Sequence, residues 1–236
     1  MNADPLPQTP RGMSRREWRE RNRRDSVPLS ILTVCTGNIC RSPMAEVILR
    51  ARLDDLDVRI QSAGAQALVG HEMPEPARAL AVEAGARAED AAAHRARFLA
   101  EPLLLEADIV LTMTRAHRSH AVAMIPSTVR RTFTVREFAR MAAALSDDEI
   151  RAAADSAGDG PRERFAAVLR ELTAQRRHST AGAADTDDDV IDPYRRSAEV
   201  YAESAAQLVP ALDEVERVVR GVLGGLGGGA VLGGGG

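Results

Sequence analysis

The stretch "LSILTVCTGNICRSPMAEVILRARL", residues 29–53, decides the expected fold because a strand, a loop and a helix follow one another in it. Residues 29–34 are a short apolar run with β-branched side chains, which is typical of a buried parallel strand. The segment "SPMAEVILRARL" then predicts a helix, with Ser42 as its N-cap and Pro43 at its first position. Strand, loop and helix in this order begin a βαβ unit.

Strand and helix patterns alternate through the rest of the chain. Further strands are predicted over 58–63, 107–113 and 131–135. Helices are expected over about 76–84, 101–106, 115–124 and 135–145, and a long last helix from about 197 to 223. This alternation predicts an α/β fold in which helices cover an open parallel sheet.

Three segments depart from the alternation. Residues 1–28 form an Arg-rich leader, for which a partly disordered, solvated tail is favoured over a docking arm for an anionic partner. Residues 141–187 are interpreted as an insertion of two helices, the second opening at Pro161, followed by an acidic loop. Residues 224–236 are a Gly-rich tail that is expected to be disordered. One domain, residues 29–223, is therefore predicted.

Composition excludes several classes of function. The net charge of −3 gives no overall attraction to nucleic acid or to a membrane surface. No apolar run approaches the roughly 18 residues that a membrane span needs, so no span is expected. The two cysteines lie five residues apart with no secretory signal before them, which favours the reducing cytoplasm. The histidines and cysteines show no metal-ligand spacing, so no metal site is expected.

The loop after the first predicted strand concentrates reactive residues, because both cysteines of the chain, Cys35 and Cys40, lie in it. Backbone N–H groups at a helix start have no intrahelical partner, and with the helix dipole they form an anion site. Gly37 and Asn38 tolerate unusual backbone conformations. Arg41 offers a planar fork that can bind two phosphoryl oxygens. The loop is therefore expected to hold a tetrahedral oxyanion.

Cys35 lies at the mouth of this predicted anion site. Positive surroundings favour thiolate over thiol, and a thiolate that faces a phosphoryl group is a nucleophile for phosphorus. Ser42 can donate a hydrogen bond to the sulfur, which would make it a better leaving group. A lone cysteine at a strand end is more often a small buried hydrophobe. The strand before the loop and the Ser-Pro start of the helix after it favour the catalytic interpretation.

The segment "ILTVCTGNICRSPMAE" resembles the signature of the low-molecular-weight protein tyrosine phosphatases, which carry Cys-x5-Arg-Ser. The resemblance covers about residues 29–140 and 188–222, and it includes "QSAG", "HRARFL", "DIVLTMTRAHR" and "DPYRRS". It implies a flavodoxin-like open parallel sheet of about four strands with helices on both faces. It also implies a phosphomonoester hydrolase that works through a phosphocysteine intermediate, without a metal or organic cofactor.

The resemblance assigns roles to the matching residues. Cys35 matches the nucleophile, Arg41 the phosphate-binding arginine and Asp192 the general acid. The phosphate-binding loop comprises Thr36, Gly37, Asn38, Ile39, Cys40 and Ser42. Support of that loop by hydrogen bonds is assigned to Asn38, Ser42, Ser62 and His94. Residues 187–189 are interpreted as a solvated acidic loop whose charge would act on Asp192.

The entrance of the expected site is assigned to three residues. Tyr194 matches the aromatic wall of the family, and Leu68 and Val69 are expected to line the opposite side. His117 and His120 are assigned to a solvated helix face.

The substrate class remains open among alternatives. The phosphoarginine branch of the family typically has threonine where this chain has Ile39, so isoleucine favours phosphotyrosine. An arsenate reductase that uses a small external thiol is a second alternative, and an inactive phosphate-binding module is a third. Cys40 either fills space or forms a protective disulfide with an oxidised Cys35. The expected partner is a phosphotyrosine-containing protein, by analogy a bacterial tyrosine kinase or its targets. The oligomeric state is not predicted.

Overall fold

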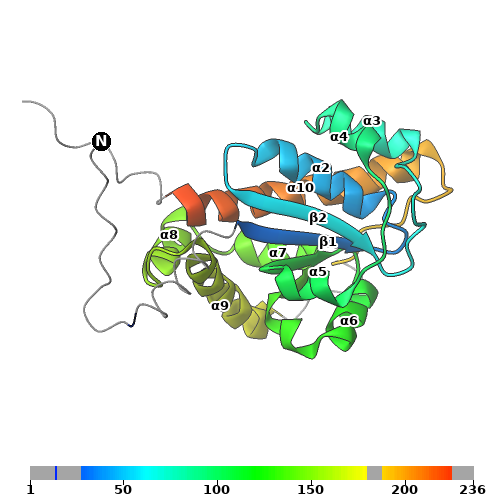
Figure 1. The fold of residues 1–236 in the computed structure, drawn as a ribbon. Helices are drawn as coiled ribbons and strands as arrows, with labels where there is room; N and C mark the ends of the chain where they lie inside the picture. The colour runs from blue at the N-terminus through cyan, green and yellow to red at the C-terminus, as the bar shows by residue number, and fades with distance from the viewer. Residues whose placement is uncertain (1–13, 15–27, 180–187, 225–236) are drawn as a thin grey trace, which may run out of the picture.

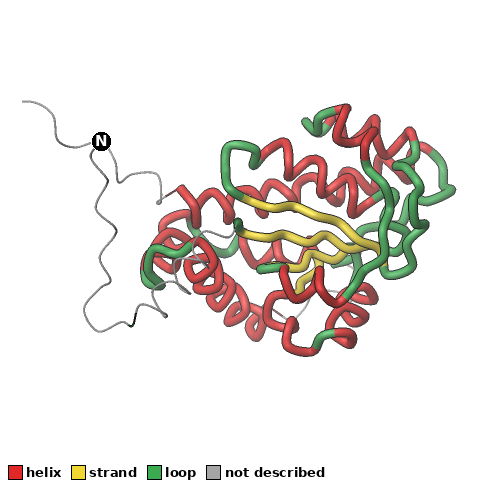
Figure 2. Tube along the Cα trace, in the orientation of Figure 1, coloured by secondary structure: helices red, strands yellow, loops and turns green. Residues whose placement is uncertain are grey.

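The computed structural model describes residue 14 and residues 28–179 and 188–224, and it shows a sheet with helices on both faces (Figures 1 and 2). The strands are β1 (Leu29–Cys35), β2 (Val58–Gly64), β3 (Ile109–Thr112) and β4 (Thr132–Thr134). All pairs are parallel, in the order β2-β1-β3-β4. This order is typical of flavodoxin-like sheets, so the predicted fold class is confirmed.

The helices of the described residues pack on the two faces of the sheet, where the apolar core forms two clusters. They are α2 (Arg41–Arg52), α3 (Glu75–Glu83), α4 (Ala88–Ala93), α5 (Glu101–Glu106), α6 (Arg115–Met124), α7 (Val135–Ala142), α8 (Asp147–Asp155), α9 (Pro161–Ser179) and α10 (Ala198–Leu223), with a 3-10 helix η1 (Pro126–Arg131). Ile31 of β1 belongs to the cluster that includes α2, α7 and α10, whereas the next residue, Leu32, belongs to the cluster of α5 and α6. Successive strand residues face opposite sides of the sheet, so each face is buried by its own helices.

Some local predictions differ from the structure. Helix α2 begins at Arg41, so Ser42 is not its N-cap, and Cys40 takes the N-cap position without a capping side chain. The hydroxyl of Ser42 instead interacts with the Cys35 sulfur, as described below. Strand β3 is shorter than predicted and begins at Ile109; Asp108, the residue before it, accepts a hydrogen bond from the Ser30 N–H at 2.8 Å. Helix α4 was not predicted.

Helices α8 and α9 lie in the segment predicted as an insertion, and α9 begins at Pro161 as expected. Phe165, Val168 and Leu172 of α9 are buried in the same core cluster as α10. That the segment is an insertion, and the domain boundaries as a whole, stay predictions. Residues 180–187, which belong to the predicted acidic loop, most of the leader and residues 225–236 lie outside the described residues. Among the helices that the structure describes, none combines the length and the apolar character that a membrane span needs.

Candidate active site

Strand β1 ends at Cys35, and its sulfur faces the loop that follows. The sulfur accepts a hydrogen bond from the Asn38 N–H at 3.3 Å and lies 3.0 Å from the Ser42 hydroxyl. These are the contacts that stabilise a thiolate, because an N–H and an O–H can both donate to it. Cys35 is almost fully buried, but it lines a cavity of about 210 Å³ at the carboxyl end of the sheet.

Asn38 organises the loop. It has a left-handed backbone (φ 55°), which asparagine tolerates better than most residues; the prediction of an unusual backbone was therefore right for Asn38, whereas Gly37 has no positive φ. The Asn38 amide donates to Ser42 Oγ at 3.0 Å and to Ser62 Oγ at 2.8 Å, and its oxygen accepts from the Arg97 N–H at 2.9 Å. The buried side chain is therefore hydrogen-bonded at both ends.

His94 and Glu46 support the loop from behind. His94 Nε2 lies 2.7 Å from the Asn38 carbonyl oxygen, and because that oxygen can only accept, Nε2 carries the proton. Burial lowers the pKa of His94 below its ordinary value. Ser62 donates to the carboxylate of Glu46, which is almost fully buried on α2. Glu46 was not predicted, although a carboxylate between apolar residues of a buried helix needs such a partner.

Gly64 lets β2 approach the loop closely. A Cβ at this position would lie 2.6 Å from the carbonyl oxygen of Thr36, and the site therefore requires glycine. Two residues further on, the Gln66 N–H donates to the same oxygen at 2.9 Å. Gln66 also lines the cavity. Sequence reasoning missed Gln66, because its contact is made through the backbone.

Arg41 connects the loop with the segment before α10. Its guanidinium donates to the Val190 carbonyl at 2.9 Å and pairs with Asp192 at 2.6 Å. The Arg41 side chain is 4% exposed, whereas that of Asp192 is 49% exposed. Arg41 Nε is buried and has no hydrogen-bond partner among the described residues. An oxyanion in the loop would give this N–H an acceptor.

The entrance residues come from two loops. Leu68, Asp192 and Tyr194 line the cavity, and the Tyr194 N–H donates to Asp192 Oδ1 at 3.2 Å. The guanidinium of Arg195 lies 5.1 Å from the centre of the Tyr194 ring. Val69 is not among the residues that line the cavity, and it is 56% exposed, so its place at the entrance stays a prediction.

Cys40 is buried behind the loop, with its sulfur 3.8 Å from the Tyr201 hydroxyl. Burial raises the pKa of this thiol to about 12, so it remains protonated at neutral pH. Cys40 is therefore not a second nucleophile in the resting protein. A protective disulfide with Cys35 stays a prediction.

His117 was assigned to a solvated surface, and this is wrong. It is 8% exposed, and its ring lies 2.8 Å from Thr36 Oγ1 through Nε2 and 2.9 Å from Thr114 Oγ1 through Nδ1. Burial, and then the nearby charge of Arg41, lower the pKa of His117 to about 4. The imidazole is thus neutral, and it connects Thr36 of the loop to Thr114 at the start of α6. His120, on the same helix, is exposed as expected.

The acidic residues before Asp192 are also placed differently from the prediction. Asp188 is buried and pairs with Arg140 at 3.0 Å. Asp189 accepts a hydrogen bond from the Arg115 N–H at 2.8 Å. These two carboxylates anchor the segment that carries Asp192, instead of forming a solvated loop.

Comparison with known proteins agrees with this geometry. A family model described as low molecular weight phosphotyrosine protein phosphatase matches residues 30–178. The match ends before Asp192, so the assignment of the acid rests on geometry and on the "DPY" resemblance. The matched region contains the whole loop from Cys35 to Ser42.

Two curated relatives illustrate the similarity. The chain is 39% identical over 97 residues to the low molecular weight protein-tyrosine-phosphatase Etp of Escherichia coli K12. The aligned residues make up 41% of this chain and 62% of that protein. The chain thus spans less than two thirds of this relative. It is 36% identical over 146 residues to a protein-arginine-phosphatase of Geobacillus stearothermophilus, which is 62% of this chain and 90% of that protein.

Solved structures show the same fold. The low molecular weight protein tyrosine phosphatase from T. tengcongensis superposes with a TM-score of 0.54 at 29% identity, covering 79% of this chain and 97% of that one. The YwlE arginine phosphatase from Geobacillus stearothermophilus gives a TM-score of 0.54 at 27% identity, with coverages of 80% and 91%.

Proposed function

The chain belongs to the low molecular weight phosphotyrosine protein phosphatase family, and we propose that it is a protein-tyrosine phosphatase with Cys35 as nucleophile. One observation carries the proposal: the Cys35 sulfur, the Arg41 guanidinium and the Asp192 carboxylate line one small cavity. A nucleophile, a phosphate-binding cation and a proton donor are the groups that phosphomonoester hydrolysis needs.

The first step forms a phosphocysteine. The Cys35 thiolate attacks phosphorus, the bond from phosphorus to the leaving phenolate oxygen breaks, and neutral Asp192 protonates that oxygen. Arg41 and the loop N–H groups stabilise the charge on the three remaining oxygens. In the structure Asp192 pairs with Arg41, so the phosphoryl group must replace this carboxylate on the guanidinium. Because the Asp192 side chain is exposed, its separation from Arg41 costs little free energy.

The second step releases phosphate. Ionised Asp192 takes a proton from water as the water oxygen attacks phosphorus, and the bond between sulfur and phosphorus breaks. The electron pair returns to Cys35 as a thiolate, which the Ser42 hydroxyl and the Asn38 N–H stabilise at 3.0 and 3.3 Å. The cycle needs only the substrate and water.

Phosphotyrosine is the proposed substrate group. Ile39 and Leu68 give the cavity apolar walls without a hydroxyl, and Tyr194 offers a ring at the entrance. These surfaces suit a phenyl ring. The proposed partner is a phosphotyrosine-containing bacterial protein, such as a tyrosine kinase or its target, and the proposed location is the cytoplasm.

Phosphoarginine is the second candidate, because a relative of which the match covers 90% is named protein-arginine-phosphatase. Parallel hydrolysis of phosphotyrosine and phosphoarginine peptides decides between them, and Ile39 predicts the higher kcat/KM for phosphotyrosine. Arsenate reduction with an external thiol is a third possibility, and it differs by consuming thiol. Phosphate release without thiol consumption would exclude it as the main activity.

The central experiment is hydrolysis of p-nitrophenyl phosphate without added metal. Wild-type protein is expected to turn over, Cys35→Ser to lose all measurable turnover, and Asp192→Asn to lose about 100-fold in kcat, which is the usual size of general-acid catalysis. The matched control is Asp213→Asn, an exposed carboxylate on α10 that forms an ion pair with Arg52. Turnover by Cys35→Ser at the wild-type rate would reject the mechanism.

A further inference from the structure

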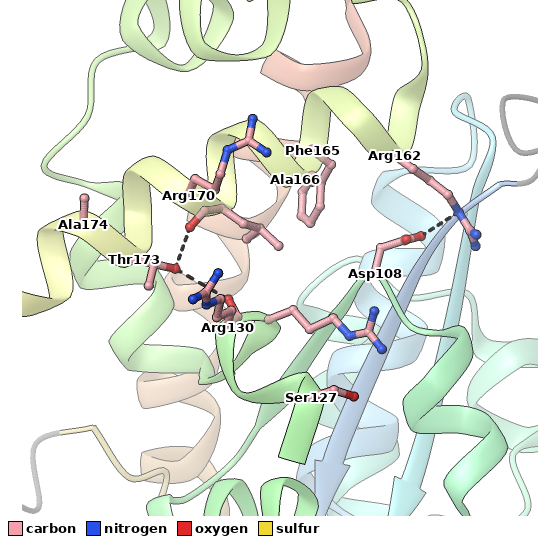
Figure 3. A pocket seen from close by; sticks show the side chains of 11 residues that line it. Asp108, Ser127, Arg130, Arg162, Phe165, Ala166, Arg170, Thr173 and Ala174 are labelled. Atoms are coloured by element: carbon pink, nitrogen blue, oxygen red, sulfur yellow. Dashed lines mark hydrogen bonds and ion pairs between the residues drawn. The ribbon is translucent and has the colours of Figure 1, made fainter. Parts of the chain in front are cut away.

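Figure 3 shows the lining of a second cavity, of about 680 Å³. This cavity lies at the opposite end of the sheet from Cys35. Its lining comes from α9, from η1 and from Asp108, the residue before β3. The hydrogen bond from the Ser30 N–H to Asp108 shows at which end of the sheet the cavity lies. Ser30 lies at the start of β1, whereas Cys35 ends that strand. The cavity is therefore separate from the catalytic loop.

The lining of this cavity is strongly basic. Four arginines and one carboxylate, Asp108, are found among the described lining residues. Arg162 lies 3.2 Å from Asp108 Oδ2, which accounts for one of the four positive charges. Arg130 and Arg170 form no ion pair with any carboxylate in the described part of the chain. The described lining residues thus carry a surplus of positive charge.

One of the arginines, Arg131, also buries a donor that lacks an acceptor in the described part of the chain. Arg131 donates through one terminal nitrogen to the carbonyl oxygens of Leu104 and Leu105, at 3.2 and 3.3 Å. The Nε of Arg131 is buried without a hydrogen-bond partner among the described residues, whereas the Nε of Arg162 faces the Asp108 carboxylate. A buried donor that is left unpaired costs free energy, which a bound acceptor would recover.

The floor of the cavity is apolar. The Phe165 ring points into it from α9, and Ala166 and Ala174 lie on the same helix (Figure 3). Leu169 is also part of the lining. A ligand that fills the cavity must therefore combine negative charge with an apolar part.

We propose that this cavity binds a small organic anion with at least two negative charges and a compact apolar part, of the size of a nucleoside diphosphate. The volume falls within the range of about 300 to 1,000 Å³ that is usual for small-molecule sites. Guanidinium groups match phosphoryl oxygens in geometry as well as in charge. A nucleic acid fits less well, because the arginines surround one hollow and the whole chain has a net charge of −3.

Titration calorimetry with ADP tests the proposal, with pyrophosphate and adenosine as partial ligands. The full-length protein is expected to bind ADP more tightly than it binds pyrophosphate or adenosine. Its affinity for ADP is expected to fall as salt is added. Arg130→Gln together with Arg170→Gln is expected to weaken ADP binding about tenfold or more, because charge-assisted contacts are lost. The control, Arg59→Gln with Arg87→Gln, removes two exposed arginines elsewhere and is expected to change the affinity less than about twofold.

A steric variant tests the cavity without changing its charge. Ala166→Trp is expected to lower ADP affinity about tenfold or more, because the larger side chain fills space that a ligand needs. No ADP binding at about 1 mM, or equal binding by wild type and both cavity variants, would overturn the proposal. Pyrophosphate binding as tight as that of ADP would overturn the claim for an apolar part. Hydrolysis of p-nitrophenyl phosphate by the double-arginine variant is expected to stay at the wild-type rate, which keeps this test independent of the phosphatase assignment.

Discussion

The two cavities at the two ends of the sheet differ in how their polar groups are satisfied. Around the catalytic loop, the Asn38 side chain bonds to Ser42, to Ser62 and to the backbone of Arg97. In the cavity under α9, Arg130 and Arg170 have no ion pair in the described part of the chain. The hydrogen bonds of the catalytic loop therefore hold its donors in place around the Cys35 sulfur. In the second cavity, the two guanidinium groups add positive charge but are not held by a partner carboxylate among the described residues.

This difference has a functional meaning. Transition-state stabilisation requires donors that need not reorganise during the reaction, and such donors must be held by their own network. Binding of a flexible anion has no such requirement, because long arginine side chains can close around the ligand. We therefore expect substitutions behind the catalytic loop to act on kcat, and substitutions around the second cavity to act on affinity for an anion alone.

Among the substitutions that leave Cys35 in place, Asn38→Ala is expected to have the largest effect. It removes three side-chain hydrogen bonds and places a residue that tolerates φ 55° less well, so the loop N–H groups lose their orientation. We expect kcat for p-nitrophenyl phosphate to fall about 100-fold or more with a smaller change in KM. Ser156→Ala is the control, because it removes one exposed side-chain hydrogen bond at the end of α8, outside the catalytic cavity. Equal kcat values for Asn38→Ala and Ser156→Ala would show that the network does not organise catalysis.

The neutral His117 predicts a pH dependence of stability. Its folded pKa of about 4 lies below the ordinary value of 6.5, so between these values the unfolded chain binds more protons. The free energy of unfolding is therefore expected to fall as pH decreases from about 6.5 to about 4, by up to about 3 kcal/mol.

Urea denaturation across this pH range measures the effect. His117→Asn is expected to have a flatter profile than the wild type, because it removes the group that must stay neutral in the fold. His120→Asn, exposed on the same helix, is the control and should keep the wild-type slope. Identical profiles for wild type and His117→Asn would show that this histidine does not take up a proton on unfolding.

Much of the catalytic loop could be predicted because its signals are local. The strand, the Cys-x5-Arg spacing and the helix start occupy consecutive residues, so Cys35 and Arg41 are juxtaposed by one turn of chain. The support from Ser62 and His94 was reached through the family resemblance. Glu46 could have been found, because a carboxylate on an apolar helix face predicts a buried partner.

The burial of His117 and the basic cavity depend on tertiary contacts that leave no pattern in the sequence. His117 follows a threonine N-cap and resembles any polar residue of a first helical turn, and its burial arises only when α6 meets Thr36. The basic cavity is likewise assembled from α9 and from η1, which are separated in the chain by α7 and α8. Its arginines have no spacing that distinguishes them in so arginine-rich a sequence.

Gly64→Ala tests the rigidity of the catalytic end by a smaller perturbation. The added Cβ would lie 2.6 Å from the Thr36 carbonyl oxygen, which is backbone and cannot rotate away. Either β2 or the loop must shift, and we expect a loss of about 1 to 3 kcal/mol in the free energy of unfolding together with a lower kcat. Gly224→Ala is the matched control, because a Cβ added there would meet nothing within 4 Å. If Gly64→Ala retains wild-type stability and kcat, the loop yields without cost, and the contrast between a rigid catalytic end and an adaptable basic cavity fails.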